Sequence, residues 1–381
     1  MADSHAGSQS DKPGESVDGG KGRVFPCEKC GADLEFHIGQ QDMKCPFCGY
    51  EKLIELAPDA EIAEQDFNAI LEKVREWREQ SSENSNDGQS EVRCSGCGAN
   101  VVFVGSLTSS ECPYCAAPIQ RDKVHDSPKR IPVHGILSFQ VEKEIARMNL
   151  SEWVRSRWFA PNEFLKRGVD GRFNGVYLPF WTYDSMTFSR YWGDRGDHYT
   201  VTVTDSNNQT HTETRTSWTS VSGSHQRFFD DVLVLATKGM SRELMDSLEP
   251  WPLTELQPFS QELLAGFLAR TYEVELDEGF PIAQKRIDVA IASDVRGLIG
   301  GDEQRVTEIK TRYDAITFKH LLLPVWLLAY RYHDKSYQIL INAVTGEVQG
   351  ERPYSFWKIT LTVLSVLAVV GLFVYFQQHA R

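Results

Sequence analysis

The chain has no N-terminal apolar run, no cysteine outside two compact groups and none of the common phosphate-binding loops. Without an apolar stretch after Met1 we expect no secretory signal peptide, and therefore a body in the reducing cytoplasm. The G-x4-G-K-[ST] motif is absent, because Gly19-Gly20-Lys21-Gly22 has neither its spacing nor its final hydroxyl. The G-x-S-x-G elbow and the H-E-x-x-H motif are absent too. These absences exclude P-loop NTPases and two widespread classes of hydrolase.

A surplus of positive charge is also missing. Lys and Arg number 40 against 53 Asp and Glu, and the net charge is −13. Nucleic-acid binding usually rests on a basic footprint, and an acidic surface repels the phosphate backbone. The charge therefore disfavours nucleic acid as a partner, although it leaves room for contact by a small basic patch. A protein partner fits it better.

All eight cysteines fall in two quartets of the form C-x2-C, 14 residues, C-x2-C. The second quartet follows the first at a displacement of 67 positions and in a similar context, which indicates tandem duplication of one module. Glycine follows three of the four cysteine turns, where a positive φ is convenient, whereas Ala116 follows the last. The predicted metal ligands are Cys27, Cys30, Cys45, Cys48, Cys94, Cys97, Cys112 and Cys115.

The chemistry of the quartets favours structural zinc. Four thiolates fill the tetrahedral shell of Zn²⁺ and leave no position for a catalytic water. Each quartet spans about 22 residues, too few for an apolar core of its own, so metal binding would supply the folding free energy. We expect two Zn²⁺ cofactors. Rubredoxin-like iron or an iron–sulfur cluster is the competing interpretation.

The predicted fold class is α+β, with two small four-cysteine zinc ribbons, a body of mixed antiparallel sheet and helix, and one C-terminal transmembrane helix. Helical patterns cover residues 141–158, 260–270 and 281–299, the last opened by Pro281 and stopped by Gly300-Gly301. Alternation typical of strands covers 175–188, 198–205, 209–219, 231–236, 304–316, 320–332 and 336–343. The expected divisions are a disordered N-terminus (1–22), zinc ribbon 1 (23–56), an amphipathic helix (57–80), a linker (81–91), zinc ribbon 2 (92–120), the α+β body (131–353) and the transmembrane helix (359–376).

The C-terminal prediction rests on 18 consecutive uncharged positions, residues 359–376. At 1.5 Å per residue they would extend about 27 Å, close to the hydrocarbon thickness of a bilayer. Aromatic residues flank the run, and Arg352 and Lys358 precede it, on the side expected to face the cytoplasm. The sequence thus predicts a tail-anchored, single-pass protein of the inner (cytoplasmic) membrane. A buried core helix is the alternative.

Candidate catalytic groups in the body are few. His225 and the pair Asp230-Asp231 have the residue types of an acid/base site, but a solvent-facing turn before the strand at 231–236 explains the pair more simply. Asp194, Asp197 and His198 lie among glycines and are read as turn formers. The aromatic residues Tyr177, Phe180, Trp181 and Tyr183 are read as core rather than as a ligand-binding face. No catalytic or cofactor-binding residue is predicted apart from the metal ligands.

The first quartet, Cys27-Glu28-Lys29-Cys30-Gly31 with Cys45-Pro46-Phe47-Cys48-Gly49, resembles the zinc-binding region of primosomal protein N′, the replication-restart helicase. As a whole the chain resembles bacterial tandem zinc-ribbon, membrane-anchored proteins labelled "primosomal protein N′ (replication factor Y), superfamily II helicase". Segments 177–184, 320–326 and 345–354 carry this wider likeness. The label implies an ATP-driven motor, yet the chain has no Walker lysine and too few residues for two motor lobes.

The predicted function is that of a membrane-anchored, cytoplasm-facing zinc-ribbon adaptor without catalytic activity, with a protein partner bound through the ribbons. The first alternative is a nucleic-acid-binding ribbon protein related to replication restart. The second is an unrecognised hydrolase that uses the histidine and aspartate residues of the body.

Overall fold

The computed structural model describes most of the body and the first cysteine quartet. The residues it describes are 16–18, 22–54, 62–81, 90–93, 100–103, 109–111, 118–120, 125–126, 130–159, 172–205, 209–332, 335–351 and 355–379. The second cysteine quartet, most of the expected N-terminal disordered segment and most of the expected linker lie outside these ranges.

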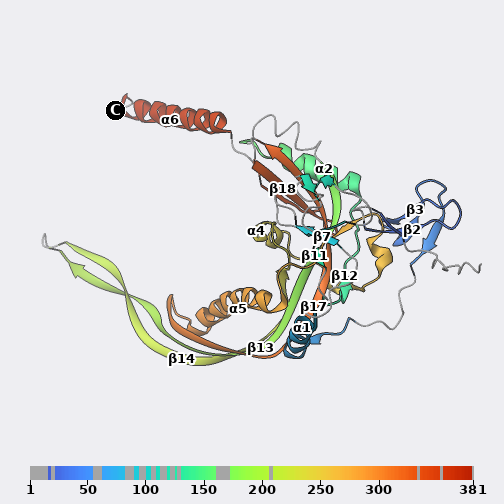
Figure 1. Cartoon of the computed structure of the whole chain (residues 1–381). Coiled ribbons are helices and arrows are strands. Elements are labelled where there is room, and N and C mark those ends of the chain that lie inside the picture. Colours follow the sequence, from blue (N-terminus) through green and yellow to red (C-terminus); the bar gives the residue numbers. More distant parts are fainter. Residues whose placement is uncertain are drawn as a thin grey trace, which may run out of the picture.

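Three very long antiparallel strands dominate the structure (Figure 1). They are β13 (Arg172–Thr204), β14 (Thr210–Leu235) and β17 (Glu303–Tyr332), arranged with β13 in the middle. The predicted pairs of shorter strands are fused in each of them, for example 304–316 with 320–332 in β17. The strands curve together around one long helix, α5 (Leu276–Ile299).

Short strands extend this sheet at the end nearer the first ribbon. Strand β17 also pairs with β6 (Gln65–Asp66), β12 (Gly135–Ile136) and β18 (Lys335–Asn342). Farther out, β12 pairs with β15 (Gln257–Pro258) and β18 with β19 (Val348–Gly350), while β16 (Leu268–Ala269) pairs with β13.

A second, five-stranded sheet carries the first cysteine quartet. Its strands follow chain order: β1 (Ser16–Asp18), β2 (Gly22–Pro26), β3 (Asp33–His37), β4 (Asp42–Lys44) and β5 (Glu51–Leu53). Further small sheets contain β7 (Ser90–Arg93), β8 (Asn100–Phe103) and β11 (His125–Asp126), and β9 (Ser109–Glu111) with β10 (Pro118–Gln120).

The helices pack against the large sheet or project from it. Helix α5 begins at Leu276, five residues before Pro281, because Glu275 and Glu278 form a reciprocal capping box there. It ends at Gly300, whose φ of 66° stops the helix as predicted. The helix predicted over 260–270 is wrong, because this segment holds a short 3-10 turn followed by β16. The other helices in the described ranges are α1 (Phe67–Ser81), α2 (Lys143–Arg155), α4 (Arg242–Asp246) and α6 (Phe356–His379).

The α+β fold class is wrong, because the described chain is mostly β. Strands β13, β14 and β17 contain 33, 26 and 30 residues, whereas the longest helices, α5 and α6, contain 24 each. The physical reason is continuity. Each long strand keeps its backbone pairing through places that sequence pattern reads as turns, so β-structure replaces the expected loops.

The expected membrane span is also corrected. Within the part of the chain that the structure describes, no helix is both long and apolar enough to cross a membrane. A span over 359–376, the membrane as a partner and an inner-membrane location are therefore not supported.

Buried aromatic residues join α5 to the sheet. Tyr177, Trp181 and Tyr183 are fully buried, which agrees with their assignment to the core. The indole N–H of Trp181 donates to the carbonyl of Val274 at 2.8 Å, and the hydroxyl of Tyr183 donates to the carbonyl of Leu276 at 2.8 Å. These bonds satisfy both buried polar atoms and fix the N-terminal end of α5 on β13.

A buried carboxylate organises the β-bulge at which the long strands bend. Register shifts flank Asp184 on both sides of β13, and Asp231 opposite it has a φ of 50°. The Asp184 carboxylate accepts the backbone N–H of Asp231 at 2.5 Å and the Thr317 hydroxyl at 3.1 Å. Lys319 lies 2.7 Å from the Asp231 carboxylate. Asp230-Asp231 is thus part of a bulge inside β14 rather than a turn before a strand.

This carboxylate generates a pH-dependent stability. Burial raises the pKa of Asp184 to about 6, outweighing the hydrogen bond from the Asp231 N–H that lowers it. Because the pKa is higher in the folded state, the protonated carboxyl stabilises the fold, fully so below the unfolded-state pKa near 4. This stabilisation is lost as pH rises through 6. We expect Asp184→Asn, which keeps the acceptor for Asp231, to remove about 3 kcal/mol of this pH dependence. Urea unfolding of both proteins from pH 4 to pH 7 measures it; parallel curves would contradict the assignment.

Candidate metal centre

Four sulfur atoms meet at the tip of the N-terminal sheet. Their Sγ atoms all lie within 4.8 Å of one another, and the pairs Cys27–Cys48 and Cys30–Cys45 are both 3.5 Å apart. A tetrahedral ion with Zn–S bonds of 2.3 Å separates its sulfurs by about 3.8 Å. The donor set therefore fits a metal ion with almost no rearrangement. The structure brings together all four ligands predicted for the first site.

Two equivalent backbone turns present these sulfurs. In the first, the N–H of Gly31 donates to the carbonyl of Cys27 at 2.8 Å; in the second, the N–H of Gly49 donates to the carbonyl of Cys45 at 3.0 Å. The glycines have φ values of 74° and 69°, so their predicted left-handed conformation is present in both turns. Each C-x2-C segment closes on itself and projects two sulfurs to one side.

The electrostatics of the cluster call for a cation. Backbone N–H groups of Cys48 and Phe47 direct hydrogen bonds at the Cys45 sulfur and lower the pKa of its thiol to about 7. The backbone N–H of Ala32 likewise favours the Cys30 thiolate, but the neighbouring sulfurs, Cys45 first, raise its pKa to about 12. The thiols therefore do not all ionise together in water, and a bound divalent ion would supply the missing positive charge.

The cluster has a buried and an exposed side. Cys27 and Cys45 are buried, whereas Cys30 and Cys48 are exposed. Below the buried pair, the N–H of Phe36 donates to the carbonyl of Ala265 at 3.1 Å, which ties β3 to the body. Apolar residues of the ribbon share one core with the body, where Phe139 stacks on Phe267 and Phe36 lies 6.3 Å from Phe267. The metal site is thus held against the large sheet by its own apolar underside.

The ligands predicted for the second site, Cys94, Cys97, Cys112 and Cys115, lie outside the described residues, but the strands around them do not. In the first ribbon Phe25 pairs with Leu34, and 67 positions later Val92 pairs with Val101. The β4–β5 pairs are repeated in the same way by β9–β10, where Glu111, Ser110 and Ser109 face Pro118, Ile119 and Gln120. The duplication therefore extends from the sequence to the strand register.

His225 and the pair Asp230-Asp231 do not meet in one site, although carboxylate oxygens of Asp230, Glu64 and Asp184 lie within 4.8 Å of one another. His225 Nε2 lies 3.1 Å from the carboxylate of Asp294 on α5, whereas Asp231 contacts Lys319 at the bulge. Asp194, Asp197 and His198 lie within β13 rather than in a turn, and His198 lies 2.8 Å from Glu303 of β17. Each of these contacts joins neighbouring elements, so the groups are explained by packing.

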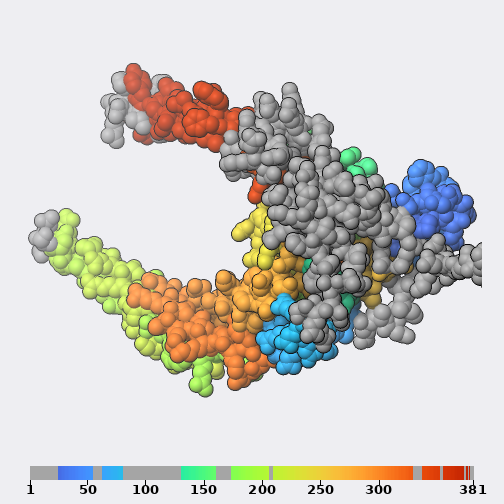
Figure 2. All heavy atoms as spheres, in the orientation of Figure 1, coloured from blue at the N-terminus to red at the C-terminus, as the bar shows by residue number. Residues whose placement is uncertain are grey.

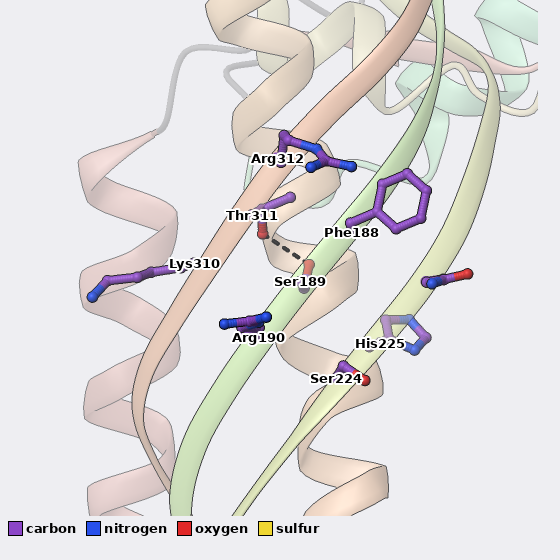
Figure 3. A pocket seen from close by; sticks show the side chains of 9 residues that line it. Phe188, Ser189, Arg190, Ser224, His225, Lys310, Thr311 and Arg312 are labelled. Carbon is purple, nitrogen blue, oxygen red and sulfur yellow. Dashed lines mark hydrogen bonds between the residues drawn. The ribbon is translucent and has the colours of Figure 1, made fainter.

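A shallow groove crosses the exposed face of the three long strands (Figure 3). Arg190 and Lys310 are direct cross-strand partners there, with Arg312 one row away. Lys310 lies 3.1 Å from Glu308, and Arg312 lies 2.8 Å from Asp314. Because acidic neighbours compensate two of its cations, the groove is not a strong basic footprint. Sequence reasoning missed it, since its lining comes from three distant segments.

The metal centre predicts a defined loss on ligand removal. Cys27→Ser should lower the metal content by one equivalent, because three thiolates and a serine bind Zn²⁺ far more weakly than four thiolates. Amide exchange should accelerate in residues 25–53 and stay slow in β17. The matched control is His37→Ala, a neighbouring side chain outside the sulfur cluster. Metal analysis of the purified chains measures the content; an unchanged value for Cys27→Ser would contradict the site.

Comparisons with known proteins give one informative match. The chain is 26% identical over 349 residues to the uncharacterized protein YdjG of Bacillus subtilis (strain 168), covering 88% of this chain and 91% of that protein. No family model and no solved structure match. The resemblance to primosomal protein N′ therefore gains no support, and the similarity to YdjG extends over nearly the whole architecture rather than the ribbon alone.

Proposed function

We propose that this protein is a zinc-ribbon adaptor: it binds a partner protein through a metal-organised surface and catalyses no reaction there. The observation that carries the proposal is the closed set of four sulfurs, Cys27, Cys30, Cys45 and Cys48, within 4.8 Å of one another. Four thiolates complete the coordination of a tetrahedral ion and leave no open position for substrate or water. Such a centre stabilises the fold of the ribbon and has no role in catalysis.

Zinc is the metal we assign, and we assign two ions. Thiolate ligands in a tetrahedral arrangement select zinc or iron–sulfur clusters, and the sulfur separations of 3.5 Å fit a single ion. The second ion is proposed for Cys94, Cys97, Cys112 and Cys115, supported by a strand register repeated at 67 positions.

The exposed side of the first ribbon supports a binding role. Phe47, between Cys45 and Cys48, is 81% exposed, and Leu53 on β5 is 79% exposed. The opposite side is already occupied by the body through Phe36 and Ala265. A metal-held turn fixes an exposed aromatic side chain at little entropic cost, which suits a contact residue at a protein interface.

Nucleic acid remains the rival partner. Zinc ribbons serve in nucleic-acid recognition, but this chain carries a net charge of −13. Around the first ribbon Lys44 lies 2.8 Å from Glu51 and Lys52 lies 3.7 Å from Glu28, so nearby cations are compensated. This arrangement favours a protein partner over a phosphate backbone.

The double substitution Phe47→Ala and Leu53→Ala tests the adaptor surface. Both side chains are exposed, so the fold and the zinc content should not change, while partner affinity should fall about 10-fold or more. Affinity capture from source cells, followed by mass spectrometry and a binding titration with the captured protein, measures the loss.

Met148→Ala is the matched control, because Met148 is a large apolar residue of α2 that is 68% exposed. It should leave capture unchanged. Equal capture by the double variant would contradict the proposal. Salt-sensitive binding of an oligonucleotide, lost in the double variant, would favour the nucleic-acid alternative instead.

A further inference from the structure

The outer edge of β14 is long, and its middle part lacks the charged and proline residues that usually prevent a free edge from pairing with another strand. In the described part of the sheet, β14 pairs only with β13, so its other edge presents backbone N–H and C=O groups to solvent. Figure 3 shows this arrangement, with β13 between β17 and the strand that carries Ser224 and His225. Residues 216–226, eleven positions, contain no Asp, Glu, Lys or Arg and no proline. Charge and proline are the usual protections of a free edge.

The opposite edge of the same sheet is protected. Residues 303–314 of β17 have no strand beside them on the side away from β13, among the pairings that the structure describes. Six of these twelve residues are charged: Glu303, Arg305, Glu308, Lys310, Arg312 and Asp314. The two edges lie on opposite sides of the same three long strands and differ in charge. The charged side chains of β17 oppose pairing with another strand, whereas the neutral segment of β14 leaves such pairing open.

We propose that the β14 edge pairs with the β14 edge of a second copy of this chain. An antiparallel pairing related by a two-fold axis at Ser220 makes one continuous six-stranded sheet, β17-β13-β14 and its symmetric counterpart. The two edges are chemically compatible, because each copy contributes the same neutral, Ser- and Thr-rich segment. The two-fold closes the assembly, and only the charged β17 edges remain outside.

Charge complementarity sets this register. With Ser220 on the axis, Glu213 of one copy faces Arg227 of the other, and the symmetry creates that pair twice. Both side chains are accessible, with 43% of Glu213 and 44% of Arg227 exposed. A register shifted by one residue in each copy would place Arg215 opposite Arg227, and like charges facing across strands are destabilising. The charged positions therefore flank the neutral segment in a self-complementary order.

The two-fold axis lies normal to the sheet, so both α5 helices cover the same face. Arg227 already contacts Asp294 of α5 at 2.9 Å, as does His225 at 3.1 Å. These contacts hold the edge flat against its helix before a second strand arrives. The hairpin of β13 and β14 projects past α5 in Figure 1, and the space-filling view in Figure 2 shows it extending clear of the body, so its backbone is reachable.

Sedimentation velocity of the full zinc-loaded chain over a concentration series tests the proposal. We expect a concentration-dependent dimer, with amide exchange in residues 216–226 slowing as the dimer forms. Glu213→Arg should weaken the dimer about 10-fold, because two like-charge pairs replace two opposite ones.

Glu308→Arg on β17 is the matched control and should leave the dimer unchanged. Thermal unfolding of each variant verifies that the fold survives, and the exchange measurement on the unsubstituted chain needs no variant. A monomer at every concentration would overturn the proposal. A dimer that is insensitive to Glu213→Arg, or unprotected amides at 216–226 within the dimer, would overturn it as well, since either result places the contact elsewhere.

Discussion

The pairing of β13 on both of its edges is the constraint on which the rest of the structure depends. From Phe180 to Gly196 this strand exchanges backbone hydrogen bonds with β14 on one side and β17 on the other. The register shifts around Asp184 form a bulge, which bends a strand, and buried hydrogen bonds to the Asp184 carboxylate replace those that the shifts disrupt. That curvature creates the concave face that receives α5.

The metal centre depends on the same sheet at its other end. Short cysteine-bearing strands have little apolar surface of their own, and a bound metal ion would be one source of their stability. The structure supplies a second source, because Phe36 and Met43 are buried in a core that also contains Phe139 and Tyr177. The ribbon is therefore oriented by the body, which leaves the metal-held turn around Phe47 facing outward.

Features that depend on the spacing of neighbouring residues could be predicted from the sequence. Features that depend on backbone pairing between distant strands could not. The sulfur cluster follows from C-x2-C spacing, and the end of α5 follows from a glycine that can adopt a positive φ, since each depends on a few adjacent residues. The sequence predicts a turn at Asp230-Asp231, and this prediction is wrong because a bulge in a long strand has the same polar composition as a loop. The buried partners that distinguish the two, Asp184 and Lys319, lie far away in sequence. The α+β prediction was wrong for the same reason.

The sequence by itself determined the duplicated cysteine module, the four sulfurs that meet in its first copy and the aromatic core, because these rest on residue chemistry and short spacings. Only the tertiary structure decided that predicted short strands join into three long ones, that the first ribbon rests on the body through Ala265, and that β14 keeps an open, neutral edge. Each of these depends on which distant backbones exchange hydrogen bonds, and no local pattern of side chains specifies that choice.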